Sequence, residues 1–182
     1  MRLLLKIYRF FFKKKDLNYY WNCRQKALYA KTKLRRTYNR HLIAKFNRKF
    51  GADISPSAMM KNMPNFPHGL FGIFISNGAV IGENCVIFHQ VSIGSNTLPD
   101  SNMGTPTIGN NVFIGAGAKI IGHVRVGNNV RIGANCVIVK DVPDNCTVVL
   151  PPPRVIEHAE PRSNKMLSFS AARRMRPKVS AE

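Results

Sequence analysis

Acidic residues are scarce in this chain of 182 residues, which has 9 Asp or Glu against 28 Lys or Arg. The imbalance lies at the ends. Residues 1–50 hold 16 of the basic residues and Asp16 as their single acidic residue, whereas residues 51–153 hold five of each sign. A partner attracted by charge is therefore expected to contact the ends of the chain and not its middle.

Long hydrophobic runs are also missing. No stretch of 18 apolar residues occurs, and Lys6 and Arg9 interrupt the one stretch that could serve as a signal sequence. The four cysteines do not form a secreted disulfide pattern, and no Cys or His cluster has the spacing of a metal site. We therefore expect a cytoplasmic, reduced protein without a bound metal.

What the chain does contain is a repeat of six residues. A small aliphatic residue returns at every sixth position, and a small or β-branched residue, twice a cysteine (Cys85 and Cys136), usually follows four places later. Turn formers such as Gly109-Asn110-Asn111 lie between them. This period fits neither a helix nor an isolated strand and predicts a three-sided β-helix, in which residue i lies beneath residue i+18. The aliphatic positions are Ile75, Ile81, Ile87, Ile93, Ile108, Ile114, Ile120, Val126, Ile132 and Ile138.

Two departures from the period mark candidate sites. Phe66 and Ile75 are nine positions apart, so three surplus residues are expected to bulge outward around His68. Ile93 and Ile108 are 15 apart where 12 would keep the register, so a loop is expected to leave the coil at about residues 95–106. In a rigid repeat, such departures are where specific chemistry is expected.

The flanking segments predict three parts: a basic helical segment over residues 1–50, the coil over 51–153, and a cap and basic tail over 154–182. Residues 1–15 alternate basic and apolar residues at helical spacing, which suits an anionic membrane surface or packing against the coil or a neighbouring subunit. Asp16 is the expected N-cap of a second helix that continues to Gly51. Three prolines at 151–153 are expected to end the coil, with a capping strand after them.

The repeat resembles the hexapeptide-repeat acyltransferases, and within them the serine acetyltransferases. This resemblance implies a mainly β protein, a left-handed parallel β-helix with an N-terminal α-helical basic segment, three associated chains and acetyl-CoA as cosubstrate. The stretch from Asp53 to His68 matches the family's catalytic segment without a gap. It implies that His68 takes the hydroxyl proton and that Asp53 orients it. The alternative for His68 is a turn residue beside Gly69, and the alternative for Asp53 is a cap at the start of a strand.

The acetyl-CoA side of the resemblance rests on Ile114-Gly115-Ala116-Gly117 and Ile132-Gly133-Ala134. Ala116 and Ala134 are 18 positions apart, so they are expected to lie one above the other with room for the pantetheine arm. We also expect acetyl-CoA to contact Ser95, near the backbone amides expected to bind the oxyanion. Lys140 resembles the lysine that contacts coenzyme A phosphate in related sugar acetyltransferases, and Arg154 could act like Lys140. A solvated charge is the alternative for both cations.

The acceptor side departs from the family. Its serine-binding Asp is replaced by Pro67, and its Arg-His pair in the loop falls on Gly104 and Thr105. Zwitterionic serine needs a carboxylate for its ammonium and a cation for its carboxylate. We therefore predict a sugar hydroxyl of a bacterial capsular or extracellular polysaccharide, or of its precursor, as acceptor. The candidate acceptor contacts are His89, Asn96 and Thr105.

Two alternatives stay open beside this acetyl-CoA-dependent O-acetyltransferase. One is a serine O-acetyltransferase of cysteine biosynthesis. The other is a non-catalytic trimeric scaffold whose basic arms bind membrane or nucleic acid, although no nucleic-acid motif accompanies the charge. Residues 1–15 suggest peripheral contact with the inner face of the cell membrane or attraction of an acidic polysaccharide.

Overall fold

The computed structural model describes residues 16–166 and 168, so the predictions for residues 1–15 and for the end of the basic tail lie outside the described residues. The chain divides into two compact units, Met1–Leu150 and Pro151–Glu182. No helix among the described residues is long and apolar enough to span a bilayer.

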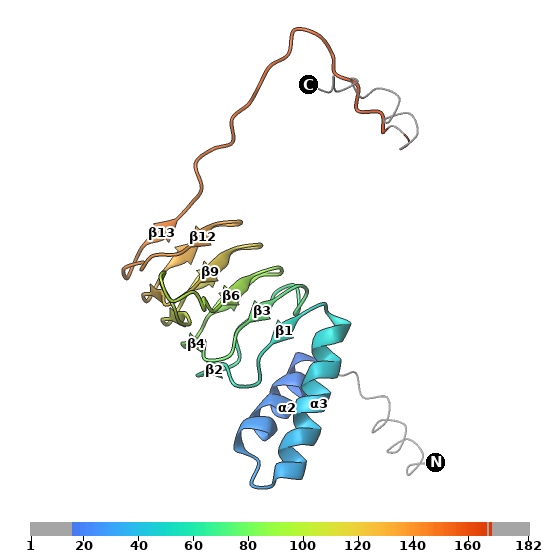
Figure 1. Ribbon diagram of the computed structural model, residues 1–182, viewed down its shortest axis with the longest axis vertical. Helices are drawn as coiled ribbons and strands as arrows, with labels where there is room; N and C mark the ends of the chain where they lie inside the picture. The colour runs from blue at the N-terminus through green and yellow to red at the C-terminus, as the bar shows by residue number, and fades with distance from the viewer. Residues whose placement is uncertain (1–15, 167, 169–182) are drawn as a thin grey trace, which may run out of the picture. The chain divides into compact units, whose positions relative to one another are not determined.

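The first unit contains a coil of short parallel strands (Figure 1). The strands form three parallel sheets, in the orders β1-β3-β6-β9-β12, β2-β4-β7-β10 and β5-β8-β11-β13, so consecutive strands fall in different sheets. We call these the first, second and third sheet. The strands are β1 (Asp53–Ile54), β2 (Met59–Met60), β3 (Phe74–Ile75), β4 (Val80–Ile81), β5 (Val86–Ile87), β6 (Ser92–Gly94), β7 (Thr107–Ile108), β8 (Phe113–Ile114), β9 (Lys119–Ile121), β10 (Arg125–Val126), β11 (Arg131–Ile132), β12 (Val137–Ile138) and β13 (Thr147–Val148).

The register confirms the predicted repeat. Ile114 pairs with Ile132, and Ile120 pairs with Ile138, each 18 residues along the chain. The aliphatic column between the sheets is buried throughout, and the small inward positions that include Cys85 and Cys136 are buried with it. Because each strand contributes only one inward aliphatic residue, the stack of coils and not the single strand creates the core.

Three corners join the sheets, and each corner stacks along the coil. The His corner, between the third and first sheets, comprises residues 66–73, 88–91, 115–118 and 133–136. The loop corner, between the first and second sheets, comprises residues 55–58, 76–79, 95–106, 122–124 and 139–141. The Asn corner, between the second and third sheets, comprises residues 61–64, 82–85, 109–112, 127–130 and 143–146.

The helices α2 (Leu17–Tyr29) and α3 (Lys33–Lys49) precede the coil as an antiparallel hairpin (Figure 1). Asp16 caps α2, as predicted, through its carboxylate and the N–H of Tyr19 (2.9 Å). The single helix expected up to Gly51 is wrong, because Ala30 is extended and Thr32 starts α3 as a new N-cap. Threonine competes for backbone N–H groups through its hydroxyl, which favours a helix start over a helix interior.

The hairpin covers the open end of the coil. Arg24 is fully buried and donates from Nη1 to the carbonyl of Ser55 (2.7 Å) and from Nη2 to that of Ala58. Asn47 donates to the carbonyl of Ile54 (3.2 Å). These carbonyls belong to the first coil and have no preceding coil to bond with, so helix side chains supply the missing donors. Burial lowers the pKa of Arg24.

The second unit departs from the prediction. Between residues 151 and 166 the structure contains no strand, and every residue there is exposed. The expected capping strand is therefore absent from residues 154–166. The three consecutive prolines provide no N–H group for a sheet, and the last coil strand is β13.

Candidate active site

The excursion that carries His68 lies at the His corner between β2 and β3. It does not bulge outward as a whole, because Leu70 and Ile73 turn inward and are fully buried. Its exposed part is held from both sides: Gly72 donates to the carbonyl of Phe50 (3.1 Å), and the Phe71 carbonyl accepts from the N–H of Gln90 (2.8 Å). The excursion is therefore anchored both to the end of the hairpin and to the next coil.

Aromatic rings reinforce the anchor on the hairpin side. Phe50 packs edge-on against Phe71, with ring centroids 5.0 Å apart, and Phe46 packs on Phe50 at 5.0 Å. Tyr20 continues the series at 5.1 Å from Phe46, and its burial raises the pKa of the Tyr20 hydroxyl to about 12. The hairpin thus positions the excursion as well as covering the coil.

Two histidines meet at this corner. The Nδ1 atoms of His68 and His89 are 2.8 Å apart, which is hydrogen-bond distance. Their ring centroids lie 4.8 Å apart, and the Phe88 and His68 rings form a T-shaped pair with centroids 5.2 Å apart and an interplanar angle of 82°. His68 is exposed and His89 is half-buried. One face of this corner therefore offers an accessible imidazole supported by a second one.

Asp53 lies close to this corner in the fold but does not bond to the pair. It starts β1, pairs with Phe74, and donates its N–H to the carbonyl of Ile73 (2.9 Å). Among the described residues, its carboxylate makes no hydrogen bond to His68. The orienting role implied for Asp53 stays a prediction.

A column of small residues continues the His corner along the coil. Gly117 donates to the carbonyl of His89 (3.1 Å), and Asn135 donates to the carbonyl of Ala116 (2.9 Å). The coils approach so closely here that a Cβ on Gly115 would lie 2.7 Å from the nitrogen of Ala134. Ala116 is half-buried and Ala134 is exposed. The predicted acetyl-CoA contacts on these two alanines therefore stack directly beyond the histidine pair.

The other predicted contacts lie elsewhere. Ser95, Asn96, Thr105 and Lys140 all belong to the loop corner, which the first sheet separates from the His corner. Two of them are occupied within that corner: Asn96 bonds to Ser101 (2.9 Å) and to the N–H of Leu98 (3.0 Å). Thr105 donates to the carbonyl of Gly78 (3.1 Å). One copy of the chain does not bring these residues to His68.

Arg154, the remaining predicted coenzyme A contact, belongs to the second unit and is exposed. Among residues 16–166 and 168, no group of three or more His, Cys, Asp or Glu side chains is arranged to hold a metal ion.

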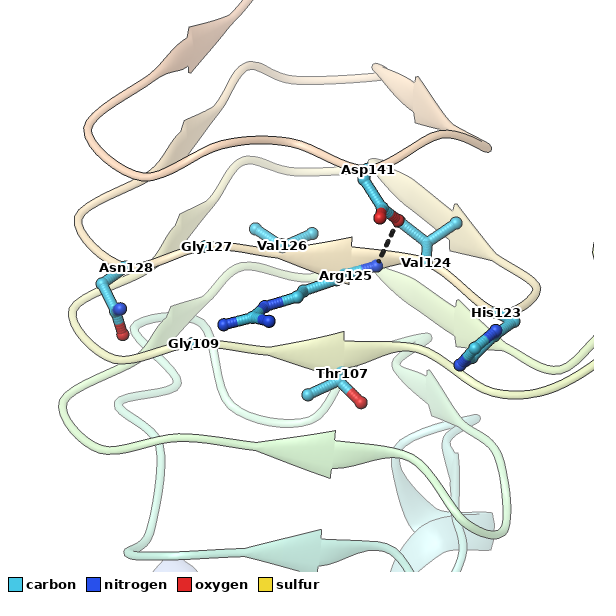
Figure 2. Close-up of a pocket in the computed structure, with 9 residues that line it drawn as sticks. All are labelled: Thr107, Gly109, His123, Val124, Arg125, Val126, Gly127, Asn128 and Asp141. Carbon is cyan, nitrogen blue, oxygen red and sulfur yellow. Dashed lines mark hydrogen bonds between the residues drawn. The ribbon is translucent and has the colours of Figure 1, made fainter.

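A separate hollow of about 440 Å³ lies on the outer face of the second sheet (Figure 2). Arg125 extends along this face, and its N–H donates to Asp141 (2.8 Å). Thr107 lies below Arg125 and His123 lies to its right in this view. The hollow contains none of the predicted site residues, so it is distinct from the histidine pair.

The sequence analysis named His89 as a candidate acceptor contact and did not predict that its ring bonds to His68. The supporting roles of Phe50, Phe71 and Phe88 were missed. The sequence shows aromatic residues beside a break in the six-residue period, but this pattern does not predict which of their rings are in contact.

Comparison with known proteins agrees with the repeat. Residues 105–140 match the family described as bacterial transferase hexapeptide (six repeats). A serine acetyltransferase of Synechococcus elongatus is 39% identical over 130 residues, which cover 69% of this chain and 52% of that protein. One from Mycobacterium tuberculosis is 38% identical over 111 residues, or 61% and 48% of the two chains. The structure of soybean serine acetyltransferase apoenzyme has a TM-score of 0.61 and 33% identity over 74% of this chain and 54% of its own.

These likenesses and the three parallel sheets define the coil as a left-handed parallel β-helix with an N-terminal helical segment. The chain belongs to the hexapeptide-repeat transferase superfamily and has serine acetyltransferases, which are acyltransferases, as homologues. It spans about half the length of the relatives it matches.

Proposed function

We propose that this chain is an acyltransferase that moves the acetyl group of acetyl-CoA to a hydroxyl of an acceptor. The observation that carries the proposal is the exposed His68, supported by His89, at the start of a column of glycine and alanine. An imidazole suits proton transfer near neutral pH. A column of small side chains leaves the backbone of the corner open to an extended thioester arm.

In this mechanism His68 accepts the hydroxyl proton while the acceptor oxygen attacks the thioester carbonyl. The new C–O bond forms, the C–S bond of the tetrahedral intermediate then breaks, and His68 returns its proton to the departing sulfur. Backbone N–H groups near Gly94 and Ser95, supplied by a neighbouring copy of the chain, are the proposed donors to the oxyanion. Proton transfer of this kind contributes about 10²- to 10⁴-fold to rate.

Serine is the acceptor that the comparisons favour, because the relatives and solved structures reported above are serine acetyltransferases. They favour this alternative over the polysaccharide reading. The enzyme would then supply an O-acetylated amino acid for cysteine synthesis.

A sugar hydroxyl is the second candidate, and a specific observation supports it. Pro67, Gly104 and Thr105 provide no charge at the positions where the family resemblance implies a carboxylate and a cation. Among the described residues, no charged side chain bonds to His68 or His89. A neutral acceptor such as a sugar would not need a charged side chain at the site.

The proposed site also requires a second copy of the chain. The His corner holds the histidine pair and the small-residue column, whereas Lys140 and the loop at 95–106 lie across the first sheet. We propose a homotrimer in which the His corner of one copy faces the loop corner of the next. Light scattering on the purified chain should give three times the chain mass, and an active monomer would contradict this arrangement.

The test of function measures thiol release from acetyl-CoA with the full chain. L-serine, nucleotide sugars and purified polysaccharides serve as acceptors. The expected result is release with one acceptor class, lowered about 10²- to 10⁴-fold in His68→Ala and unchanged in the control His41→Ala, whose residue is exposed on α3. Full activity in His68→Ala would refute the mechanism. Serine-dependent release would decide for serine, and release only with a glycan would decide for the sugar.

A further inference from the structure

We propose that His89 is a positioning residue that sets the tautomer of His68, in place of the carboxylate that the family resemblance implies. This inference rests on the proposed function, since it assigns how the base of that reaction is prepared. It differs from the prediction that His89 contacts the acceptor.

The contact itself restricts the protons. Two neutral imidazoles can bond through their Nδ1 atoms only when one Nδ1 carries hydrogen and the other does not. The 2.8 Å separation of the two Nδ1 atoms is therefore compatible with opposite tautomers of His68 and His89. Equal tautomers would bring two N–H groups or two lone pairs together.

The exposed ring decides which tautomer serves the reaction. His68 is exposed and His89 is half-buried, so His68 meets the acceptor. Its Nδ1 is engaged with His89, which leaves Nε2 as the nitrogen that can take the proton. Nε2 is free of hydrogen only when Nδ1–H is present, so His68 donates and the bare Nδ1 of His89 accepts. After proton uptake, the imidazolium of His68 can keep the same hydrogen bond.

The backbone around His89 holds that ring in place. Its carbonyl accepts from Gly117 (3.1 Å), and the next residue, Gln90, has a positive φ of 59° and bonds to the excursion through Phe71 (2.8 Å). Phe88 also packs on His68 in a T-shaped arrangement. His68 is thus held by an aromatic ring contact and by a nitrogen acceptor.

The kinetic test uses a matched pair of substitutions. Asparagine at position 89 can place its Oδ1 near the former Nδ1 and accept from His68, whereas leucine removes the acceptor and keeps the bulk. His89→Leu should lower kcat about 10- to 100-fold, the range seen for partners that orient a metal-binding histidine, with KM for acetyl-CoA unchanged. His89→Asn should recover most of that loss. His68→Asn should be as inactive as His68→Ala, because an amide does not act as a base.

Three outcomes would overturn the proposal. His89→Leu with wild-type kcat would show that the contact is irrelevant. A change confined to acceptor KM would return His89 to the acceptor-binding role. Recovery of kcat in His68→Asn but not in His89→Asn would mean that His89 takes the proton and that His68 is the positioning residue.

Long-range ¹⁵N–¹H NMR of the full chain separates this inference from the proposed function. At a pH above the imidazole range, His68 should carry hydrogen on Nδ1 and His89 on Nε2. Two Nε2–H tautomers would refute the pair whatever the activity. Opposite tautomers in a chain that transfers acetyl to no acceptor would support the pair and refute the function.

A different observation carries a second inference, which does not depend on the activity. We call residues 26–36 the turn end of the hairpin. No acidic residue of the hairpin balances its basic residues, because no Asp or Glu occurs between Leu17 and Lys49. The cations of the turn end are all exposed, namely Lys26, Lys31, Lys33, Arg35 and Arg36. Buried residues such as Tyr20, Ile43 and Phe46 lie nearer the other end of the hairpin.

We infer that this turn end binds an anionic phospholipid surface. A hollow of about 400 Å³ is lined by Lys26, Lys31 and Arg35 together with Tyr29, which is 78% exposed, and suits a phosphate headgroup. Leu34, also at the turn end, is 83% exposed. A soluble polyanion would leave these apolar surfaces in water, whereas the boundary between headgroups and acyl chains would bury them.

Vesicle sedimentation with the full chain tests this inference. We expect binding to phosphatidylcholine vesicles that contain phosphatidylglycerol and none to phosphatidylcholine alone. Lys31→Gln with Arg35→Gln should weaken binding about 10-fold or more, and Tyr29→Ser with Leu34→Ser should weaken it at high salt. The control Arg125→Gln with Arg131→Gln removes equal charge from the coil and should change little.

Equal loss in the coil control would mean that net charge, and not the turn end, drives binding. Wild-type binding by both hairpin variants would refute the assignment. Binding to a soluble polyuronate but not to the anionic vesicles would replace the lipid by an acidic polymer.

Discussion

The Asn corner and the His corner follow similar backbone paths around one coil, but their side chains do different work. At the Asn corner, side-chain oxygens accept from the backbone of the preceding coil: Asn110 from Glu83 (2.9 Å), Asn128 from Asn110 (2.8 Å) and Asp144 from Asn128 (2.8 Å). A continuous polar ladder therefore closes this corner along the axis.

Positive φ angles add to the contrast. Asn84, Asn111, Asn129 and Asn145 all have φ between 55° and 60°, and the last three also bond to one another through their side-chain amides. At the His corner the corresponding residues are Gln90 and Asn135, each with φ 59°, and between them Gly117, with φ 70° and no side chain. The same turn thus carries an amide ladder at the Asn corner, whereas at the His corner the series of amides is interrupted at Gly117, where the backbone of the middle coil has no side chain over it.

Breaking the tight stacking should have the largest effect on stability. A Cβ on Gly82, at the Asn corner, would lie 2.4 Å from the carbonyl oxygen of Gly109, which is backbone and cannot move aside. We expect Gly82→Ala to lower the free energy of unfolding by about 3 kcal/mol. At the His corner the nearest atom to a Cβ on Gly133 is 3.2 Å away, so Gly133→Ala should cost less than about 1 kcal/mol. Urea denaturation measures both, and equal losses would contradict the comparison.

Exchanging bulk at equivalent positions should separate function from stability. Ala116 and Asn110 are each the second residue after an inward isoleucine. Ala116→Leu should raise KM for acetyl-CoA about 10-fold or more, equivalent to about 1.4 kcal/mol, with an unchanged melting temperature. Asn110→Leu should lose the acceptor for Glu83 and about 1 to 2 kcal/mol of stability, with KM unchanged. A melting loss in Ala116→Leu without any effect on KM would remove the column from the site.

Acid should weaken the Asn ladder first at Asp144. The hydrogen bonds from Asn128 lower the pKa of this exposed carboxyl below the unfolded value of about 3.9. Its contribution to stability is therefore present above that value and is lost as pH falls through the lower folded pKa. Asp144→Asn should be less stable than the wild type at neutral pH, and the difference should shrink below about pH 4. Urea midpoints across that range test this, and a constant difference would be evidence against the ladder.

Thiol labelling should show the smallest effect. Burial raises the pKa of Cys85, whose side chain points into the core at the Asn corner. Cys146 is half-buried at the far end of the same corner. In the native chain Cys146 should react with a maleimide well before Cys85, which should label only on unfolding. Simultaneous labelling would show that the coil opens at its middle.

Much of the coil could be predicted because its information is local and repeated. The six-residue period gives the inward column, the corners and the pairing of Ile114 with Ile132 without knowledge of any distant contact. The helical hairpin was harder to predict from the sequence. Apolar residues such as Leu34 and Tyr38 fit the pattern of one long helix, but they are exposed in the two helices of the structure. Thr32, the residue that starts the second helix, is a signal of only about 1 kcal/mol.

The sequence by itself determined that this protein is a three-sided parallel coil with two departures from its period, because one aliphatic residue in six forces the same burial at every turn. Only the tertiary structure decided that His68 meets His89, that Arg24 covers the first coil, and that the loop lies across the first sheet from the histidines. Such contacts depend on side-chain direction and on residues that the repeat does not constrain, and no local pattern encodes them.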